Sequence, residues 1–389
     1  MSLCKSVSRK AGSSAQTDTI GLDSTYDGIC GLWLLRAAAA GIGNAAQLFS
    51  ESCRRITGLP ILPKAETDEE DDIDADAERA VRRRADALVR KHLTTRERNG
   101  TVRSGVLITN IAVLGERLGL SPAEREILAF AVLLNTCTAL KKYLAAANIN
   151  NCTKETYVQV LSTVLGFPRA AVKQAFGERS ILVNTGLITL HKELLDFEDK
   201  LDSHCGLADI LLDAYTTPDE LFGRFHRVAP APALTPADYP HIREDFELLC
   251  TCLARSIAAR ETGVNVLLYG NTGTGKTEFA RVLAAALGAR LIEVACEDDV
   301  GDPITGKSRL SSYQLCQRFL EQADNTLVLF DEIEDVLQPG NPFAIIFCDG
   351  KGVEAGKAWI NRILETNPLP TLWLSNEVEQ IDPDRKSVV

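Results

Sequence analysis

A glycine-rich turn that carries one lysine and one threonine is the stretch of this sequence that most clearly predicts chemistry. Glycines let the backbone curl so that successive N–H groups point inward, and the start of a helix adds positive potential. Such a loop holds phosphate oxygens, with Lys276 expected to reach the β- and γ-phosphates and the Thr277 hydroxyl expected to hold Mg²⁺. The loop consists of Gly270, Asn271, Thr272, Gly273, Thr274, Gly275, Lys276 and Thr277.

The residues on either side of this loop have the patterns of a buried strand and of a helix. Residues 264–269 are mostly apolar. After the loop, Phe279, Val282 and Leu283 recur at helical spacing, and Gly288 is a suitable C-cap. This order of strand, loop and helix favours a phosphate-binding loop over an ordinary glycine turn.

Two further apolar runs end in polar side chains. Residues 326–330 lead into Asp331 and Glu332, and residues 370–375 lead into Asn376. Strands that are buried on both faces present their C-terminal ends at the edge where α/β sheets bind ligands. We expect Asp331 to hold Mg²⁺ through its water shell, Glu332 to polarise the water that attacks the γ-phosphate, and Asn376 to orient that water. The alternative is that the two acids only occupy the turn after an ordinary strand. The presence of the phosphate loop makes this alternative less favoured.

Together these stretches resemble the Walker A, Walker B and sensor 1 motifs of AAA-type ATPases, the AAA+ branch of P-loop proteins. The glutamate after Asp331 and the asparagine at 376 are characteristic of that branch. Residues 306–310 resemble its helix-opening segment, and residues 381–383 resemble the sequence that follows sensor 1. The resemblance covers residues 240–383 approximately. It implies an α/β fold with a three-layer parallel sheet and flanking helices, ATP and Mg²⁺ as cofactors, ATP hydrolysis, and assembly into a ring.

Two features depart from this family. Residues 300–305 lack the aromatic residue that grips substrate in the pore of many members, which argues against polypeptide threading by that device. The arginine fingers and the lid with sensor 2 should follow Asn376, and the sequence supplies neither, so we expect the chain to bind ATP better than it hydrolyses it. Residues 384–389 equal the translation of GATCGGAAGAGCGTCGTG, part of a common sequencing adapter, and we interpret them as a non-native tail.

Composition indicates a globular protein of two or three domains. The chain has 389 residues, of which 45% are hydrophobic, so it can bury a sizeable core. Its net charge of −11 argues against a general nucleic-acid binder. The 11 cysteines include no Cys-x-x-Cys pair, which favours reduced thiols and a cytoplasmic location. The longest apolar run near the N-terminus is too short to span a bilayer, so we expect no membrane contact.

The N-terminal part reads as two segments. Residues 1–78 are expected to be poorly ordered, because residues 1–28 are rich in Ser, Thr and Gly and residues 66–78 are almost wholly acidic. Between them, residues 29–50 have the composition of an Ala-rich helix weakened by two glycines. A basic helix begins at Arg79 and neutralises the acidic run, while a nucleic-acid contact there is the less favoured interpretation.

Residues 79–228 are expected to form a helical region that binds a partner. Ser121 and Glu124 form a capping box, with proline at the first helical position. Residues 181–188 resemble a strand pair, so the region suggests a winged-helix-like module, although generic helical packing fits nearly as well. The second helix of that module carries only Arg169 and Lys173 as cations, which favours protein docking over DNA reading.

Residues 229–240 are rich in proline and alanine and read as a linker, followed by the incomplete ATPase core of residues 241–383. The leading interpretation is an ATPase that remodels a protein partner through its N-terminal region. A nucleotide-gated switch or scaffold with little turnover, and a DNA-associated ATPase, remain open. Glu332 favours hydrolysis over a switch. His241 and Ile242 are candidates for adenine contacts, with an ordinary surface histidine as the alternative.

Overall fold

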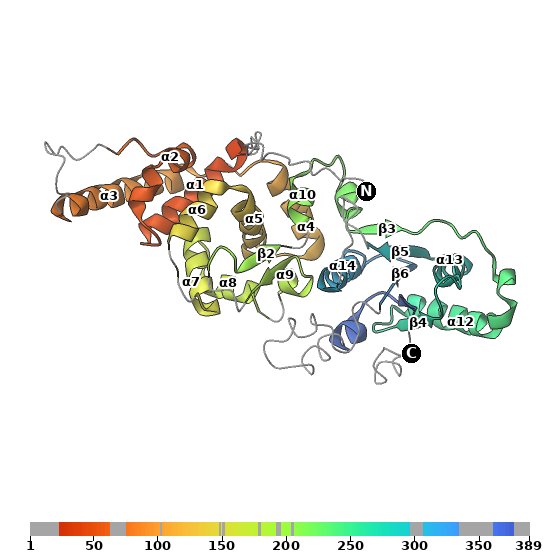
Figure 1. The fold of residues 1–389 in the computed structure, drawn as a ribbon. Helices are drawn as coiled ribbons and strands as arrows, with labels where there is room; N and C mark the ends of the chain where they lie inside the picture. The colour runs from red at the N-terminus through yellow and green to blue at the C-terminus, as the bar shows by residue number, and fades with distance from the viewer. Residues whose placement is uncertain are drawn as a thin grey trace, which may run out of the picture.

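The computed structural model describes residues 23–62, 75–101, 103–147, 149, 152–177, 180–191, 196–203, 206–295, 306–333 and 361–376. A helical region occupies one end of the molecule, and a β-sheet flanked by helices occupies the other (Figure 1). Residues 66–74 of the acidic run, residues 300–305, the segment 381–383 and the tail 384–389 lie outside the described residues, so the predictions made for them stay predictions.

The first half of the chain is built mainly from helices. In chain order these are α1 (Asp23–Ala39), η1 (Ala45–Phe49), α2 (Glu51–Thr57), α3 (Ala75–Asn99), α4 (Val106–Leu118), α5 (Pro122–Thr136), α6 (Thr138–Ala146), α7 (Lys154–Leu165), α8 (Arg169–Ala175), α9 (Ile181–Asn184), α10 (Leu207–Leu212) and α11 (Pro218–Phe222), where η marks a 3-10 helix. Within the described part of the chain no single helix is long and apolar enough to cross a membrane, and α5 and α6 pass that test only as a pair that bends by 93°.

The prediction that residues 1–78 are poorly ordered is wrong for residues 23–62. Helix α1 lies in the core of the helical region, where Trp33 is fully buried and its indole Nε1 donates to Glu126 Oε1 at 3.1 Å. The predicted Ala-rich helix of residues 29–50 begins earlier and ends at Ala39, because Gly41 and Gly43 adopt positive φ angles of 77° and turn the chain. The apolar residues of α1 surround the helix on all sides, which is typical of a helix buried by its neighbours.

The capping box at the start of α5 is confirmed, since Ser121 and Glu124 cap each other's backbone N–H groups. Residues 181–188 do not form a strand pair. Instead Ser180 caps the short helix α9, and the side chain of Glu124 accepts hydrogen bonds from Ser180 Oγ at 3.2 Å and Ile181 N at 3.1 Å. The hairpin comes later, as β1 (Ile188–Leu190) paired antiparallel with β2 (Leu201–Ser203). Whether these elements form a winged-helix-like module stays a prediction.

Among the described residues, five strands form one sheet in the order β3-β5-β6-β7-β4. Strands β4, β5, β6 and β7 run parallel, whereas β3 pairs antiparallel with β5 at one edge. Their bounds are β3 (His226–Val228), β4 (Asn265–Tyr269), β5 (Arg290–Val294), β6 (Thr326–Phe330) and β7 (Thr371–Ser375). The predicted α/β fold is therefore confirmed, with an antiparallel edge strand added. Because β3 belongs to the sheet, the sheet begins before the predicted linker at residues 229–240.

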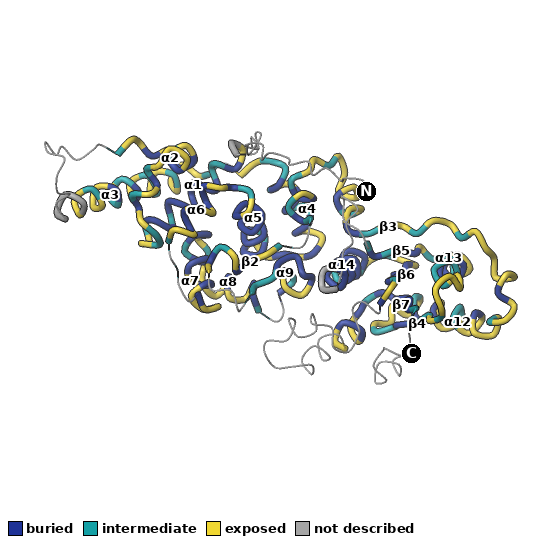
Figure 2. Tube along the Cα trace, viewed as in Figure 1, coloured by how far each residue is buried: buried dark blue, intermediate teal, exposed yellow. Residues whose placement is uncertain are grey.

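Helices cover both faces of this sheet. They are η2 (Pro236–Asp238), η3 (Pro240–Ile242), α12 (Arg243–Ala259), α13 (Lys276–Ala286), α14 (Gly306–Phe319) and a helical stretch at residues 361–366. Side chains alternate between the two faces along each strand. Leu327 and Leu329 of β6 pack with α12 and α13, whereas Val328 and Phe330 pack with α14 in a cluster that continues into the helical region. In Figure 2 the tube of β6 and most of the tube of α14 have the dark blue of buried residues.

The helical region packs directly on α14. Arg117 of α4 donates from Nε to the Phe319 carbonyl at 3.0 Å. The rings of Phe222 and Phe225 lie 5.1 Å and 5.2 Å from the ring of Phe319. Helix α14 is therefore shared between the sheet and the helical region.

Candidate nucleotide-binding site

The polar residues predicted to act together lie at one edge of the sheet. Strand β7 lies between β4 and β6, and Tyr269 pairs with Ser375 while Phe330 pairs with Trp373. Gly270 N donates to the Ser375 carbonyl at 3.3 Å, which extends the pairing into the phosphate loop. The C-terminal ends of the three strands are thereby held next to each other, as expected for parallel neighbours.

The phosphate loop has the backbone conformation that its glycines allow. Gly273 and Gly275 have φ angles of 82° and 81°, in the left-handed region that other residues rarely adopt. Gly275 is the N-cap of α13, which begins at Lys276. The residues from Asn271 to Gly275 are exposed, so their N–H groups at the start of this helix are open to an anion.

Lys276 joins the loop to the end of β7. Its ammonium Nζ donates to the Gly270 carbonyl at 2.8 Å, to the Asn271 carbonyl at 3.0 Å and to Asn376 Oδ1 at 2.9 Å. These are hydrogen bonds to neutral oxygens, and the lysine is only half-buried. An anionic oxygen at this position would be a stronger acceptor for the ammonium than a carbonyl.

Thr277 joins the loop to the end of β6. Its hydroxyl Oγ1 donates to Asp331 Oδ2 at 3.0 Å, and both side chains are half-buried. A hydroxyl and a carboxylate are the oxygen donors that Mg²⁺ takes together with phosphate oxygens. The residues present therefore fit the predicted magnesium site, which Asp331 and Thr277 would share.

Glu332 lies next to this pair in an unusual backbone conformation. Its φ angle is 52°, its side chain is exposed, and its backbone N–H donates to Asp331 Oδ1 at 2.9 Å. A residue other than glycine rarely adopts positive φ, and such residues cluster at functional sites. The sequence predicted the position of this carboxylate but not the left-handed turn that presents it to solvent.

Tyr239 is a residue that the sequence analysis missed. The tyrosine is 6% exposed, and burial raises its pKa. Its ring packs edge-on against Phe279 of α13, with centroids 5.1 Å apart, and its hydroxyl has no hydrogen-bond partner among the described residues. A Cβ placed on Gly275 would lie 3.9 Å from that hydroxyl. Tyr239 therefore lies beside the loop. The exposed His241, which the sequence nominated together with Ile242, has its ring 6.4 Å from the Tyr239 ring.

The proline-rich segment is tied to the helix that follows the loop. The carboxylate of Glu278 accepts hydrogen bonds from the backbone N–H groups of Leu234, at 3.0 Å, and of Ala233. The hydrogen bond from Leu234 is the largest cause of the lowered pKa of Glu278. Part of the predicted linker is thus fixed against α13 rather than free.

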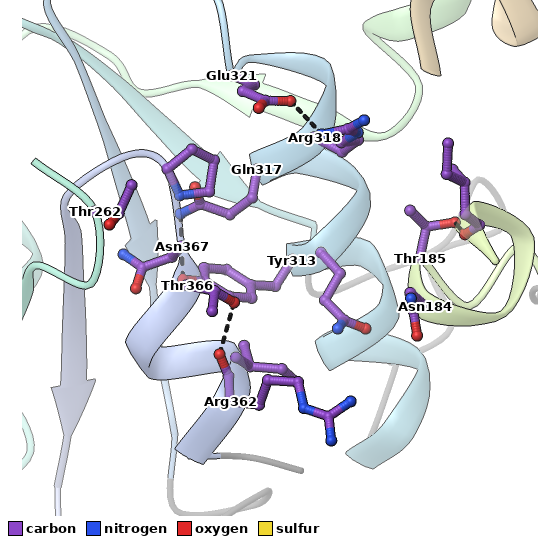
Figure 3. A pocket seen from close by; sticks show the side chains of 14 residues that line it. Asn184, Thr185, Thr262, Tyr313, Gln317, Arg318, Glu321, Arg362, Thr366 and Asn367 are labelled. Carbon is purple, nitrogen blue, oxygen red and sulfur yellow. Dashed lines mark hydrogen bonds and ion pairs between the residues drawn. The ribbon is translucent and has the colours of Figure 1, made fainter. Parts of the chain in front are cut away.

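A cavity of about 590 Å³ lies away from this site, between α9, α14 and residues 361–368. Thr262 and Pro368 line it, and these residues precede β4 and β7, so the cavity lies at the opposite end of the strands from the phosphate loop. Figure 3 shows its polar wall on α14, where Arg318 pairs with Glu321. The predicted site residues do not line this cavity.

Comparison with known proteins agrees with the geometry. The model of the ATPase family associated with various cellular activities (AAA) matches residues 266–365. ORC1-type DNA replication protein 7 of Halobacterium salinarum is 29% identical over 133 residues, which is 33% of this chain and 24% of that protein. ORC1-type DNA replication protein 4 of Haloarcula marismortui is 30% identical over 108 residues, which is 27% of this chain and 20% of that protein. The chain thus spans about a quarter or less of these relatives' length.

Two solved structures match part of the chain. A chain in the HORMA:CdnC:Trip13 complex of E. coli MS115-1 matches with a TM-score of 0.27 and 18% identity, covering 42% of this chain and 66% of that chain. PCH-2 of C. elegans matches with a TM-score of 0.26 and 23% identity, covering 39% of this chain and 41% of that chain. The family match and the replication-protein relatives, together with the site geometry, show that residues 266–365 resemble the ATPase domain of AAA-type proteins.

Proposed function

We propose that this protein binds Mg-ATP where β4, β6 and β7 end, and that it hydrolyses ATP to remodel a protein partner. The observation that carries the proposal is the pair of contacts that joins three strand ends. Lys276 Nζ lies 2.9 Å from Asn376 Oδ1, and Thr277 Oγ1 lies 3.0 Å from Asp331 Oδ2. These contacts support the proposal, because they bring together a lysine, a hydroxyl, a carboxylate and an amide, which are the groups that phosphate binding, magnesium binding and water orientation would need.

Each of these residues has a distinct role in the proposal. Lys276 exchanges its carbonyl acceptors for phosphate oxygens, and Thr277 and Asp331 hold the metal. When bound, Mg²⁺ neutralises the charge on the phosphates. The Glu332 carboxylate accepts a proton from water, and the Asn376 amide orients that water.

Substitution of Glu332 by glutamine tests the hydrolysis step. Glu332→Gln keeps the side-chain size but removes the carboxylate that accepts the proton, so we expect unchanged ATP affinity and at least a 100-fold slower single turnover, since general base catalysis contributes about 10²–10⁴-fold. The measurement uses excess protein over radiolabelled ATP, which detects slow cleavage. Glu261→Gln, on an exposed residue after α12, is the matched control. A Glu332→Gln protein that cleaves ATP at the unmodified rate would show that another group is the base.

The proposal extends to the partner and to assembly. The helical region would provide the surface for the protein partner, and copies of the chain would form a ring. Support comes from the packing of the helical region on α14, because this helix also contacts the nucleotide-binding edge of the sheet. We place the protein in the cytoplasm, since the seven cysteines in the described ranges are free thiols, which a reducing compartment favours.

A DNA-associated ATPase is a second candidate. The two relatives named above are DNA replication proteins, and α3 exposes cationic side chains at Arg82, Arg83, Arg84, Arg90 and Lys91. The net charge of −11 weighs against it. Single-turnover ATP cleavage with and without duplex DNA, at physiological ionic strength, separates the two. A DNA-dependent rate that Arg82→Ala and Arg83→Ala abolish would favour this candidate, and an unchanged rate favours the protein remodeller.

A further inference from the structure

Arg309, in the first turn of α14, is a buried cation at the turn that carries Glu332. It is 2% exposed. Its Nη2 donates to the Asp331 carbonyl at 2.6 Å, and its Nη1 donates to the Glu332 carbonyl at 3.4 Å. Its guanidinium carbon lies 4.6 Å from the centre of the Phe330 ring. One side chain thus contacts three consecutive residues where β6 ends.

The burial of this charge calls for a specific reason. Removing a charge from water costs several kcal/mol unless partners compensate for it. Within the described ranges no carboxylate pairs with Arg309, and its Nε has no hydrogen-bond partner. Its partners are two backbone carbonyls and an aromatic face. Hydrogen bonds to two successive carbonyls fix the path of the backbone, whereas a carboxylate partner would mainly neutralise the charge.

The backbone that Arg309 holds is the strained one. Glu332 has a φ angle of 52°, in the left-handed region, and such a conformation persists only where the surrounding structure holds it. On one side Ile333 N donates to the Leu374 carbonyl of β7 at 3.0 Å. On the other side the Arg309 guanidinium binds the carbonyls of Asp331 and Glu332. The turn is therefore fixed between β7 and α14.

Helix α14 is itself held firmly. Its Ser311 side chain lies so close to Gly186, after α9, that an added Cβ on Gly186 would collide with it. Its last residue, Phe319, contacts Arg117, Phe222 and Phe225 of the helical region. Arg309 thus extends from a helix whose position the helical region sets.

We propose that Arg309 is a positioning residue for ATP hydrolysis, which holds the Asp331–Glu332 turn so that the Glu332 carboxylate faces the water beside the phosphate loop. The inference rests on the proposed function, because it is that function that gives Glu332 its role. Arg309 touches neither nucleotide nor water in this scheme. It acts through the backbone of the residue that does.

Two measurements on the full chain test this proposal. The first compares Arg309→Met and Arg309→Lys with the unmodified protein in equilibrium binding of a fluorescent ATP analogue and in single-turnover ATP cleavage. We expect ATP affinity to change less than about threefold. Cleavage should fall about 10–100-fold in Arg309→Met, because a displacement of about 1 Å at a reacting group has effects of this size. Arg309→Lys keeps one donor and should lose less.

The second measurement is amide hydrogen exchange at residues 331–333 without nucleotide, so it does not depend on turnover. Exchange of the Glu332 and Ile333 amides should be at least about tenfold faster in Arg309→Met, while the amides of α13 and β7 keep their rates. Arg318→Met, on the exposed part of the same helix where Arg318 pairs with Glu321, is the control and should change neither quantity. A purely structural role for Arg309 would instead accelerate exchange across α14 and weaken ATP binding equally.

The outcomes separate this inference from the function on which it rests. If the unmodified chain binds no Mg-ATP, the proposed function fails. If it binds Mg-ATP but exchange at residues 331–333 is unchanged in Arg309→Met, the positioning role is overturned and the proposed function stands. Combining Arg309→Met with Glu332→Gln should add no further loss of cleavage, and a full additive loss would also overturn the positioning role.

Discussion

At the scale of single residues, the site follows closely from the spacing of its polar side chains. The order of a glycine loop, an acidic strand end and an asparagine strand end was enough to predict that Lys276, Asp331 and Asn376 lie together, because parallel neighbours present their C-terminal ends at one edge. In the structure Lys276 Nζ lies 2.9 Å from Asn376 Oδ1, and Thr277 Oγ1 lies 3.0 Å from Asp331 Oδ2, so the three strand ends meet. The catalytic roles of these residues stay predictions.

Thr277 gives a test of the metal site at this scale. Thr277→Ala removes the hydroxyl that bonds to Asp331, so Mg²⁺ loses one protein ligand and ATP binding in magnesium should weaken about tenfold or more. Binding in EDTA should hardly change, since the lysine and the loop remain. Titration calorimetry in both conditions measures this.

Thr274→Ala is the matched control, because it also removes a threonine hydroxyl from the loop, but one that donates to the Asn271 carbonyl at 2.9 Å instead of to Asp331. An equal loss in magnesium and in EDTA for Thr277→Ala would argue against a metal role for that hydroxyl.

The sequence did not predict Arg309 or the left-handed φ of Glu332. Both depend on how α14 packs against the end of β6, which is a contact between residues far apart in the chain. The sequence shows only that Arg309 lies in the first turn of a segment expected to open a helix. This is a weak signal, because arginines at such positions are mostly exposed. A buried guanidinium that binds carbonyls has no sequence pattern of its own.

At the scale of elements, a buried polar network fixes the end of the sheet opposite the nucleotide site. Asn265 of β4 donates to the Leu364 carbonyl at 2.6 Å and accepts from Trp373 Nε1 of β7 at 2.9 Å. Gln317 of α14 donates to Thr371 Oγ1 at 2.9 Å and accepts from Leu369 N at 2.9 Å. Because these groups are satisfied by one another, the register of α14 and of β7 is specified by hydrogen bonds as well as by packing.

Asn265→Ala should therefore destabilise the fold strongly. The substitution leaves the Trp373 indole N–H and the Leu364 carbonyl buried with fewer partners, and each such group costs about 1–3 kcal/mol, so we expect a loss of about 2–4 kcal/mol in unfolding free energy. Urea unfolding followed by circular dichroism measures it. The exposed Asn135→Ala should change stability by less than about 0.5 kcal/mol. A loss below about 1 kcal/mol for Asn265→Ala would show that the network contributes little.

Element predictions succeeded where the periodic pattern was strong and failed where tertiary contacts decide. The strands at residues 265–269 and 326–330 and the helix after the loop were predicted well, because apolar runs and a capped helix are local signals. Helix α1 was missed as part of the core because the residues around it suggested a solvated segment. Its burial depends on Trp33 meeting Glu126 of α5, a contact that composition does not report.

At the scale of the whole molecule, the sheet separates two packing environments. One face packs with α12, α13 and Tyr239, while the other face forms a continuous core with α14 and the helical region. The prediction of a Pro-rich boundary near residues 229–240 did not include β3, which joins the sheet ahead of those prolines. Edge strands are short and carry little pattern, so this addition was not accessible from the sequence.

A continuous core predicts cooperative unfolding. We expect α1 in the helical region and β6 in the sheet to lose protection at the same urea concentration, because separating them would expose Phe319 and the α14 face to water. Pulsed hydrogen exchange across a urea series, read separately for residues 29–39 and 326–330, measures both in one protein. Persistent protection of β6 after α1 has exchanged completely would indicate two independently stable units instead.

The central claim is that a triphosphate binds at the junction of three strand ends, held by the loop and by Lys276. Calorimetric titration of the full chain with Mg-ATP tests it most directly, with Lys276→Ala as the variant and Lys173→Ala, which pairs with Glu155 on the helical region, as the control. We predict one ATP bound per chain by the unmodified and control proteins, and an affinity at least about 30-fold lower in Lys276→Ala. Equal affinity in Lys276→Ala and the unmodified chain would contradict the account.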